Sequence, residues 1–252
     1  MGLAASAALA GWLAVAGTLM PAQAPAPPAA AIDPAAARSA MVELIQTKMT
    51  ALASRTGYAA LDPRVAAAFR GVPRHAFLPP EAMQFAYLDT PLPLGHGQAL
   101  TMPLIAAIMT QALDIRPGDR VLETGTDVGY QAAILATLGA EVHSVEIVAP
   151  LLAVAKRTLA ELGHGRVRLK EGDGWYGWAE NGPYDAILLK ESAAEIPPPI
   201  WRQLKPGGRL VMPLGGPGAQ ELVRIVKQPD GGRRSTTLLE VRFTPFQGGE
   251  RT

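Results

Sequence analysis

Residues 116–130 read RPGDRVLETGTDVGY, and this stretch decides the fold. Residues 120–123 have an apolar strand pattern, a glycine-containing turn follows, and residues 129–138 then have a helical pattern. A strand that passes through a glycine turn into a helix is typical of α/β proteins, because glycine lets the backbone approach a ligand closely. Taken alone, the turn is also compatible with a tight connection that binds nothing.

Downstream of this unit, strand and helix patterns alternate to the C-terminus. The run YDAILL at 184–189 is continuously apolar, as expected for a strand that is buried on both faces. This alternation predicts an α/β fold with a mostly parallel sheet and helices on both faces. The last two strands should pair antiparallel across Asp230-Gly231-Gly232. The predicted strands are 141–146, 167–169, 184–189, 208–213, 222–226 and 238–243, and the predicted helices are 150–162 and 197–204.

Upstream, the pattern changes to helices that start with a recognisable signal. Asp33-Pro34 and Asp62-Pro63 each place a capping carboxylate before a proline at the first helical position. They predict an N-terminal helical layer over about 34–70. Residues 71–100 contain many prolines and indicate mostly loop, and Thr101 is a candidate N-cap for a third helix.

Length and composition limit the functions that remain. The chain has 252 residues, which suits one sizeable α/β domain. Lys and Arg total 23 and Asp and Glu total 22, so no basic excess points to nucleic acid as a partner. The absence of cysteine excludes disulfides, thiolate nucleophiles and cysteine-ligated metals, and the four histidines lack the spacing of a metal site.

Residues 1–32 contain no charged side chain and precede a single predicted domain at 33–252. Gly2 to Met20 is a small and apolar run, and Pro21-Ala22-Gln23-Ala24 has the A-x-A form of a signal-peptidase site. No Lys or Arg precedes the run. Three interpretations stay open: a cleaved leader that sends the protein to the periplasm or outside the cell, a retained membrane anchor, and a start codon placed too far upstream, which would leave the protein in the cytoplasm.

Acidic side chains follow three successive predicted strands, where ligands of parallel sheets bind. Glu123 ends the first strand, Glu146 ends the second, and Gly172-Asp173-Gly174 follows the third. A carboxylate at the position of Glu146 can accept both hydroxyls of an adenosine ribose. The pattern describes a nucleoside pocket without a phosphate-binding lysine, which favours S-adenosylmethionine over ATP or NAD.

The chain resembles the protein-L-isoaspartate (D-aspartate) O-methyltransferases over about 35–246. The resemblance is carried by VPRHAFLP at 72–79, AYLDTPLP at 86–93, GHGQ at 95–98, PGDRVLE at 117–123, GYQAA at 129–133, EGDG at 171–174, LKPGGRLV at 204–211 and VRF at 241–243. It implies a Rossmann-like methyltransferase fold, S-adenosylmethionine as the donor, and a monomer that acts in protein repair. The acceptor would be the free carboxylate of isoaspartyl residues in proteins or peptides, whose methyl ester collapses to a succinimide.

The resemblance also implies roles for individual residues. Glu123, Gly125, Asp127 and Gly129 would line the methionine end of the donor, Glu146 would hold the ribose, and Asp173 and Gly174 would lie by the adenine. Gln98 and the backbone of 95–98, with His96 and Gly97, would face the acceptor, and Thr101 takes the place of a family serine. Because a carboxylate is already a nucleophile, catalysis would need alignment and exclusion of water.

Two departures from the family pattern fall in the expected pocket. The glycine turn usually reads GTGSG, whereas Asp127 and Val128 stand here. Asp tolerates a positive φ better than most residues do. After the fourth strand, Lys190-Glu191 replaces a neutral wall; the two could pair with each other at the surface, or Lys190 could bind a substrate carboxylate. The alternative function is a methyltransferase-fold protein that is catalytically silent or has another acceptor.

Overall fold

One seven-stranded sheet organises the domain, and the order of its strands shows where a ligand can bind. The computed structural model describes residues 33–216 and 218–248. The strand order is β5-β4-β3-β6-β7-β8-β9, with parallel pairing from β5 through β7 and antiparallel pairing of β7 with β8 and of β8 with β9. The strands are β3 (Arg120–Thr124), β4 (Glu141–Glu146), β5 (Arg168–Glu171), β6 (Tyr184–Leu188), β7 (Leu204–Gly216), β8 (Ala219–Lys227) and β9 (Arg233–Val241).

This arrangement confirms the predicted sheet, including the C-terminal antiparallel pair. The chain passes from β3 to β4 on one side and returns to β6 on the other, so the strand order reverses between β3 and β6. Ligands of parallel sheets bind at such a reversal, beyond the carboxyl ends of the strands. The segments that follow β3 and β6 are therefore the ones that matter for function.

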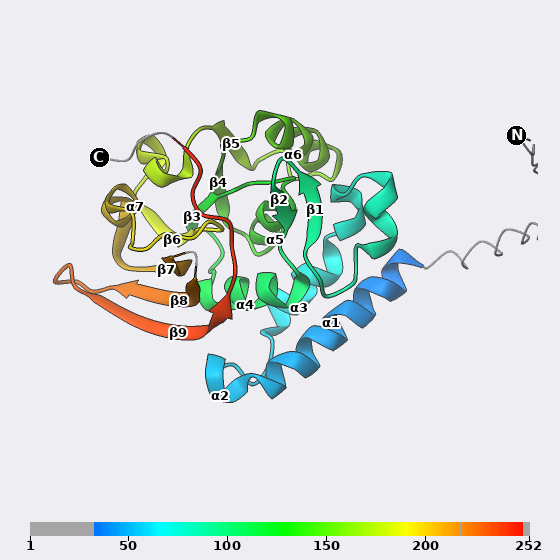
Figure 1. Cartoon of the computed structure of the whole chain (residues 1–252), viewed down its shortest axis with the longest axis horizontal. Coiled ribbons are helices and arrows are strands. Elements are labelled where there is room, and N and C mark those ends of the chain that lie inside the picture. Colours follow the sequence, from blue (N-terminus) through cyan, green and yellow to red (C-terminus); the bar gives the residue numbers. More distant parts are fainter. Residues whose placement is uncertain (1–32, 217, 249–252) are drawn as a thin grey trace, which may run out of the picture. The chain divides into compact units, whose positions relative to one another are not determined.

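Alternate residues of the central strands pack into two separate cores. Val121 and Val211 belong to the larger core, whereas their neighbours Leu122 and Leu210 belong to the smaller one. Because side chains alternate across a strand, both faces of the sheet are covered, as the apolar run at 184–189 predicts. Helices contribute to both cores. They are α1 (Pro34–Ala51), α2 (Ala53–Thr56), α3 (Pro63–Gly71), α4 (Pro103–Leu113), α5 (Tyr130–Thr137), α6 (Ala149–Glu161) and α7 (Pro198–Gln203) (Figure 1).

The predicted caps of the first helices are confirmed, whereas the predicted cap of α4, Thr101, is wrong. Asp33 accepts from the backbone N–H of Ala35, and Asp62 accepts from that of Arg64. Helix α4 is instead preceded by Met102, whose side chain makes no capping bond. The carboxylate of Asp89 accepts from Leu104 N at 2.9 Å and does the capping from a distant segment. Thr101 is consequently free of a capping role.

The proline-rich segment 71–100 is more ordered than the prediction of a loop. It contains the 3-10 turns η1 (Arg74–Phe77) and η2 (Pro80–Phe85) and a small antiparallel hairpin of β1 (Leu92–Gly95) and β2 (Gln98–Leu100). These elements are too short to give a periodic pattern. The hairpin places Gln98 near the carboxyl ends of β3 and β6, close to Gly125 and Lys190.

The chain after β9, residues 243–248, is here termed the C-terminal segment. The carbonyl oxygen of Thr244 accepts from Ser192 N at 2.9 Å, and Phe246 N donates to the carbonyl oxygen of Ser192 at 3.2 Å. Figure 1 shows this segment in red; it leaves the end of β9 and, in this view, runs upward past the label of β3. Residue 192 follows β6, so these bonds hold the C-terminal segment at the carboxyl ends of the central strands.

Within residues 33–216 and 218–248, no helix combines the length and apolar character needed to span a membrane. The predicted leader or anchor at 1–32 lies outside the described residues. Its cleavage, retention or absence therefore stays a prediction from the sequence.

Candidate functional site

Two carboxylates at the ends of β3 and β4 are buried and held in place by hydrogen bonds. Glu123 accepts from the hydroxyl of Ser144 at 2.7 Å. Glu146 accepts from the backbone N–H of Asp127 at 2.7 Å and from that of Val148 at 2.8 Å. Burial raises the pKa of both carboxyls, and Lys190 opposes this effect at each. Each oxygen of Glu146 has a second lone pair, so two adjacent hydroxyls of a ribose can still donate to it.

The altered glycine turn has a left-handed backbone. Gly125, Asp127 and Gly129 have φ values of 66°, 51° and 95°. Asp127 thus lies in the left-handed region, which its short side chain can adopt. A Cβ at Gly129 would lie 3.0 Å from Leu159, so this glycine lets α5 pack against α6. The structure thus gives Gly129 a packing role, whereas Gly125 and Asp127 line the pocket.

Lys190 reaches back across the sheet to the turn that follows β3. Its Nζ lies 3.0 Å from Oδ2 of Asp127 and 3.2 Å from Oε1 of Glu123. The expectation that Lys190 and Glu191 form a surface pair is wrong, because Lys190 is 8% exposed and its partners are these two carboxylates. Burial acts to lower the pKa of Lys190, but the attraction to Asp127 and Glu123 is stronger, and its pKa is raised. The ammonium stays charged.

Glu191 points to the other side of the same turn. It accepts from the hydroxyl of Thr124 at 2.5 Å. A Cβ at position 125 would lie 2.7 Å from its Oε1, so the side chain covers Gly125. Desolvation raises the pKa of Glu191 to about 8, against the opposing effect of the Thr124 bond. At neutral pH this carboxyl is therefore largely protonated and able to donate a hydrogen bond.

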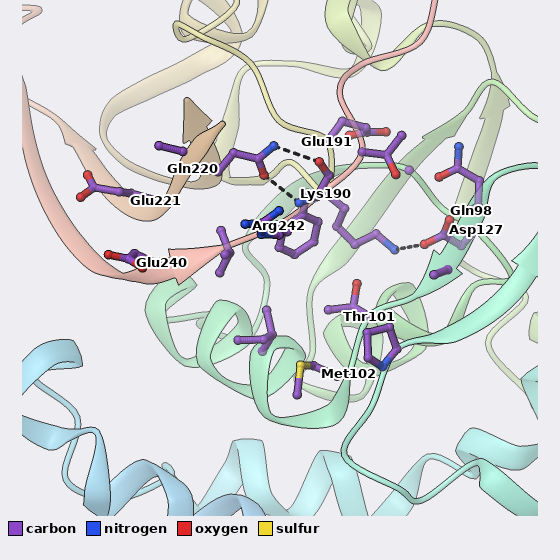
Figure 2. A pocket seen from close by; sticks show the side chains of 18 of the residues that line it. Gln98, Thr101, Met102, Asp127, Lys190, Glu191, Gln220, Glu221, Glu240 and Arg242 are labelled. Carbon is purple, nitrogen blue, oxygen red and sulfur yellow. Dashed lines mark hydrogen bonds and ion pairs between the residues drawn. The ribbon is translucent and has the colours of Figure 1, made fainter. Parts of the chain in front are cut away.

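A pocket of about 710 Å³ opens beyond these residues. Gln98 and Thr101 line it from the side of the β1–β2 hairpin, and Asp127, Lys190 and Glu191 line it from the strand ends. Figure 2 shows Lys190 extended toward Asp127, with Gln98 and Thr101 beside this pair. The far wall comes from β8, β9 and the C-terminal segment. The hydroxyl of Thr101, the amide of Gln98 and the partly buried carboxyl of Glu191 thus border one pocket. Its volume is large enough for a peptide side chain and part of a second ligand.

The predicted nucleoside side of the site is narrower. Glu146 and Gly174 line a space of about 20 Å³, which residues 245–247 close from above. Asp173 does not line it; its carboxylate accepts from Trp175 N at 2.9 Å and fixes the turn after β5. A Cβ at Gly174 would lie 2.8 Å from Thr124, so only glycine fits beside β3. A space of about 20 Å³ is too small for an adenosine.

The structure brings most of the predicted residues together at one place; the exceptions are Gly129 and Asp173, described above, and His96 and Gly97 on the hairpin. Glu123, Gly125, Asp127, Glu146 and Gly174 meet at the strand ends, as do Gln98, Thr101 and Lys190. His96 and Gly97 form the exposed tip of the β1–β2 hairpin and do not line the pocket.

Two supporting residues escape prediction from the sequence. Arg74 is completely buried; its Nε donates to the carbonyl oxygen of Ala86 at 2.9 Å and its Nη2 to that of Thr101 at 2.8 Å. Gln220 donates to Ser192 Oγ and to the carbonyl oxygen of Phe243, each at 3.0 Å, and ties the C-terminal segment to the strand ends. Arg74 stands in the VPRH motif, which signals its importance but not its partners. Gln220 has no signal in the sequence.

Comparison with known proteins agrees with this geometry. A family model described as protein-L-isoaspartate(D-aspartate) O-methyltransferase matches residues 46–251. The chain is 45% identical over 212 residues to protein-L-isoaspartate O-methyltransferase 1 of Cupriavidus necator, covering 84% of this chain and 82% of that protein. It is 49% identical over 185 residues to protein-L-isoaspartate O-methyltransferase of Opitutus terrae, covering 73% and 79% of the two chains.

Solved structures give the same result for the fold. A protein-L-isoaspartate O-methyltransferase superimposes with a TM-score of 0.73 at 27% identity, covering 84% of this chain and 66% of that one. A putative enzyme of the same kind from Plasmodium falciparum, in complex with S-adenosyl-L-homocysteine, gives a TM-score of 0.70 at 20% identity, over 83% and 98% of the two chains. The second likeness concerns the fold alone.

Proposed function

This chain belongs to the protein-L-isoaspartate(D-aspartate) O-methyltransferase family, and we propose that it methylates the free carboxylate of isoaspartyl residues in damaged proteins. The methyl donor is S-adenosylmethionine, which supplies a methyl group on a positively charged sulfur. The observation that carries the proposal is the shared pocket, in which acceptor-side residues Gln98 and Thr101 face the acidic strand ends. The methyl ester then gives a succinimide, and its hydrolysis restores part of the normal aspartate.

The residues at the strand ends fit this donor chemically. Glu146, with each oxygen already aligned by a backbone N–H, would hold the ribose hydroxyls. Two acidic side chains, Glu123 and Asp127, contact the one cation Lys190, and Glu146 lies beside Asp127, so acidic groups outnumber basic ones and suit a cationic ligand. Gly174 would border the adenine.

On the acceptor side, the chain has to align a carboxylate and keep water away. The hydroxyl of Thr101 and the amide of Gln98 can donate to one oxygen of that carboxylate and leave the other free for attack. No general base is needed, because the acceptor is already ionised at neutral pH. Glu191 is largely uncharged there, so it does not repel the acceptor. The C-terminal segment borders both the pocket and the nucleoside space, where it would help to exclude water.

The test compares two peptides of identical sequence, one with isoaspartate and one with aspartate. The full chain should transfer labelled methyl groups from S-adenosylmethionine to the isoaspartyl peptide only, as a base-labile ester. If S-adenosylhomocysteine binds but neither peptide is methylated, the enzyme uses another acceptor. If a folded chain binds no S-adenosylhomocysteine, it is a catalytically silent member of the family.

The compartment is a separate proposal. We propose that the protein is exported, supported by the uncharged residues 1–32 and the A-x-A pattern that ends at Ala24. N-terminal sequencing of the protein from fractionated cells should give a periplasmic product that starts at Pro25. A cytoplasmic product that starts near Asp33 would contradict export. That the enzyme is a monomer stays a prediction from the resemblance, and light scattering measures it directly.

A further inference from the structure

The two residues that depart from the family pattern, Asp127 and Lys190, meet in the pocket. We propose that they act as a pair that binds the amino-acid end of the methyl donor: Asp127 accepts from its α-ammonium group, and Lys190 donates to its α-carboxylate. This inference rests on the proposed function, because it concerns how that donor is held. It reassigns Lys190 from the acceptor to the donor.

Both charged groups keep an unused bonding position. A lysine ammonium has three N–H donors. One of them donates to Oδ2 of Asp127 at 3.0 Å, and Oε1 of Glu123 lies 3.2 Å from Nζ as an ion-pair partner that accepts no hydrogen bond. Nζ has no other partner among the described residues, so Lys190 can donate to a ligand. Oδ1 of Asp127 likewise accepts no hydrogen bond within the described part of the chain. Asp127 and Lys190 both line the 710 Å³ pocket, so these free positions are accessible to a ligand.

The spacing of the pair matches the head group of an α-amino acid. In an α-amino acid, the ammonium nitrogen and the nearer carboxylate oxygen are roughly 2.7 Å apart, as standard bond lengths dictate. The nitrogen and oxygen of the Lys190–Asp127 pair are 3.0 Å apart. A zwitterion placed head to tail against this pair therefore forms two ion pairs at once. A carboxylate alone, or an ammonium alone, would form one.

The ion pair with Glu123 explains how Lys190 can bind a ligand carboxylate and keep its position. Because Glu123 is buried and bonded to Ser144, it anchors the ammonium independently of Asp127. Asp127 can then turn one oxygen toward a ligand while Lys190 remains paired. Both anchors of Lys190, Glu123 and Asp127, belong to β3 and the turn after it, the segment that also holds Glu146 through Asp127 N. The pair thus lies on the donor side of the pocket.

The test uses two ligands that share a nucleoside and differ in the amino-acid end. S-adenosylhomocysteine carries this end, and 5′-methylthioadenosine lacks it. Calorimetric titration into the full chain should show that Lys190→Met weakens binding of S-adenosylhomocysteine at least tenfold and changes binding of methylthioadenosine less than twofold. The matched control is Lys205→Met, which removes an equally close ion pair, with Asp185 at 2.7 Å, that does not line the pocket. It should change neither affinity.

Each other outcome would overturn the assignment. Equal losses for both ligands, or tighter binding of S-adenosylhomocysteine to Lys190→Met, would mean that Lys190 is structural or obstructs the donor. If Lys190→Met does not fold, Asp127→Asn answers the same question, because Asn also tolerates positive φ and removes only the charge. If the wild-type chain binds both ligands equally well, Asp127 and Lys190 do not bind the amino-acid end of the donor. The proposed methylation of isoaspartyl residues is unaffected by that result. If it binds neither, the proposed function fails as well.

Discussion

The buried guanidinium of Arg74 donates a hydrogen bond from Nη2 to the carbonyl oxygen of Thr101, at 2.8 Å. A second bond from Nε to Ala86 and a stacking contact 4.8 Å above the Tyr130 ring complete its environment. Arg74 thereby connects the segment after α3 to Thr101, the residue that we propose faces the acceptor. It is a positioning residue, since it acts on the pocket through Thr101.

Replacement of Arg74 by Met should lower both stability and acceptor affinity. Two carbonyl oxygens lose their partner, which costs about 2–5 kcal/mol in the free energy of unfolding. The KM for an isoaspartyl peptide should rise, because the backbone at Thr101 is no longer fixed. Urea unfolding and steady-state kinetics measure the two effects. The exposed Arg157→Met is the control, with a change below about 0.5 kcal/mol; an unchanged KM in Arg74→Met would contradict the positioning role.

The Thr101 hydroxyl should contribute to catalysis itself. Thr101→Val keeps the shape and loses the donor, so kcat/KM should fall by roughly 10²-fold. Thr101→Ser should retain most of the activity. Calorimetry with S-adenosylhomocysteine should give the same Kd for all three proteins. Equal activity of the Val and Ser variants would exclude a role for the hydroxyl.

Asp127 and Lys190 should be strongly coupled in stability. Lys190→Met leaves two buried carboxylates without their cation, and the expected cost is about 3–5 kcal/mol. In the double variant Asp127→Asn/Lys190→Met one of these charges is also gone, so the double variant should be more stable than Lys190→Met alone. Denaturant unfolding of the four proteins gives the coupling energy, expected near 1–3 kcal/mol. Additive effects would show that the pair contributes little.

Stability should depend on pH through Glu191. Its pKa is raised to about 8 in the folded protein by burial, so the folded state holds this proton more tightly than the unfolded state does. The stabilising contribution is complete below the unfolded pKa, near 4.3, and is lost as pH rises through about 8. Relative to Glu191→Gln, the wild type should therefore lose stability between pH 5 and pH 8.5. A constant difference between the two proteins over this range would contradict a raised pKa.

The C-terminal segment should control access of the donor. The ring of Phe246 packs edge-on against Trp175, with centroids 5.7 Å apart, above the narrow nucleoside space. Phe246→Ala should loosen this cover and raise both the association and the dissociation rate of S-adenosylhomocysteine. Stopped-flow measurement of tryptophan fluorescence follows these rates. The removed contacts should also cost up to about 3 kcal/mol in stability. Unchanged rates would mean that the donor enters elsewhere.

Local patterns were sufficient for most of the fold. The caps at Asp33 and Asp62 depend on neighbouring residues only, and the apolar run at 184–189 reflects burial on both faces of the sheet. Thr101 was expected to cap α4 because it has the right side chain at the right place. Asp89 does so instead, because the chain folds back and brings a stronger acceptor to Leu104.

The sequence predicts most of the residues that meet at the strand ends, but not which of them pair with one another. Asp127 and Lys190 are 63 residues apart in the chain. They meet because β3 and β6 are neighbours in the sheet, a relationship that is fixed by the strand order and not by either local sequence. Adjacent Lys190 and Glu191 looked like a pair, yet successive side chains leave a strand end in different directions. The bonds between the C-terminal segment and residue 192 join parts of the chain that are distant in sequence, so no local pattern indicates them.

The pocket is built from residues that span Pro91 to Thr244. During synthesis, the strands that carry Glu123 and Glu146 leave the ribosome long before β9 and the C-terminal segment do. A chain that ends before β9 keeps the donor-side carboxylates and lacks the wall that the acceptor requires. Truncated translation products and most proteolytic fragments should consequently be unable to modify proteins, so the cell obtains repair activity only from chains that have been completed.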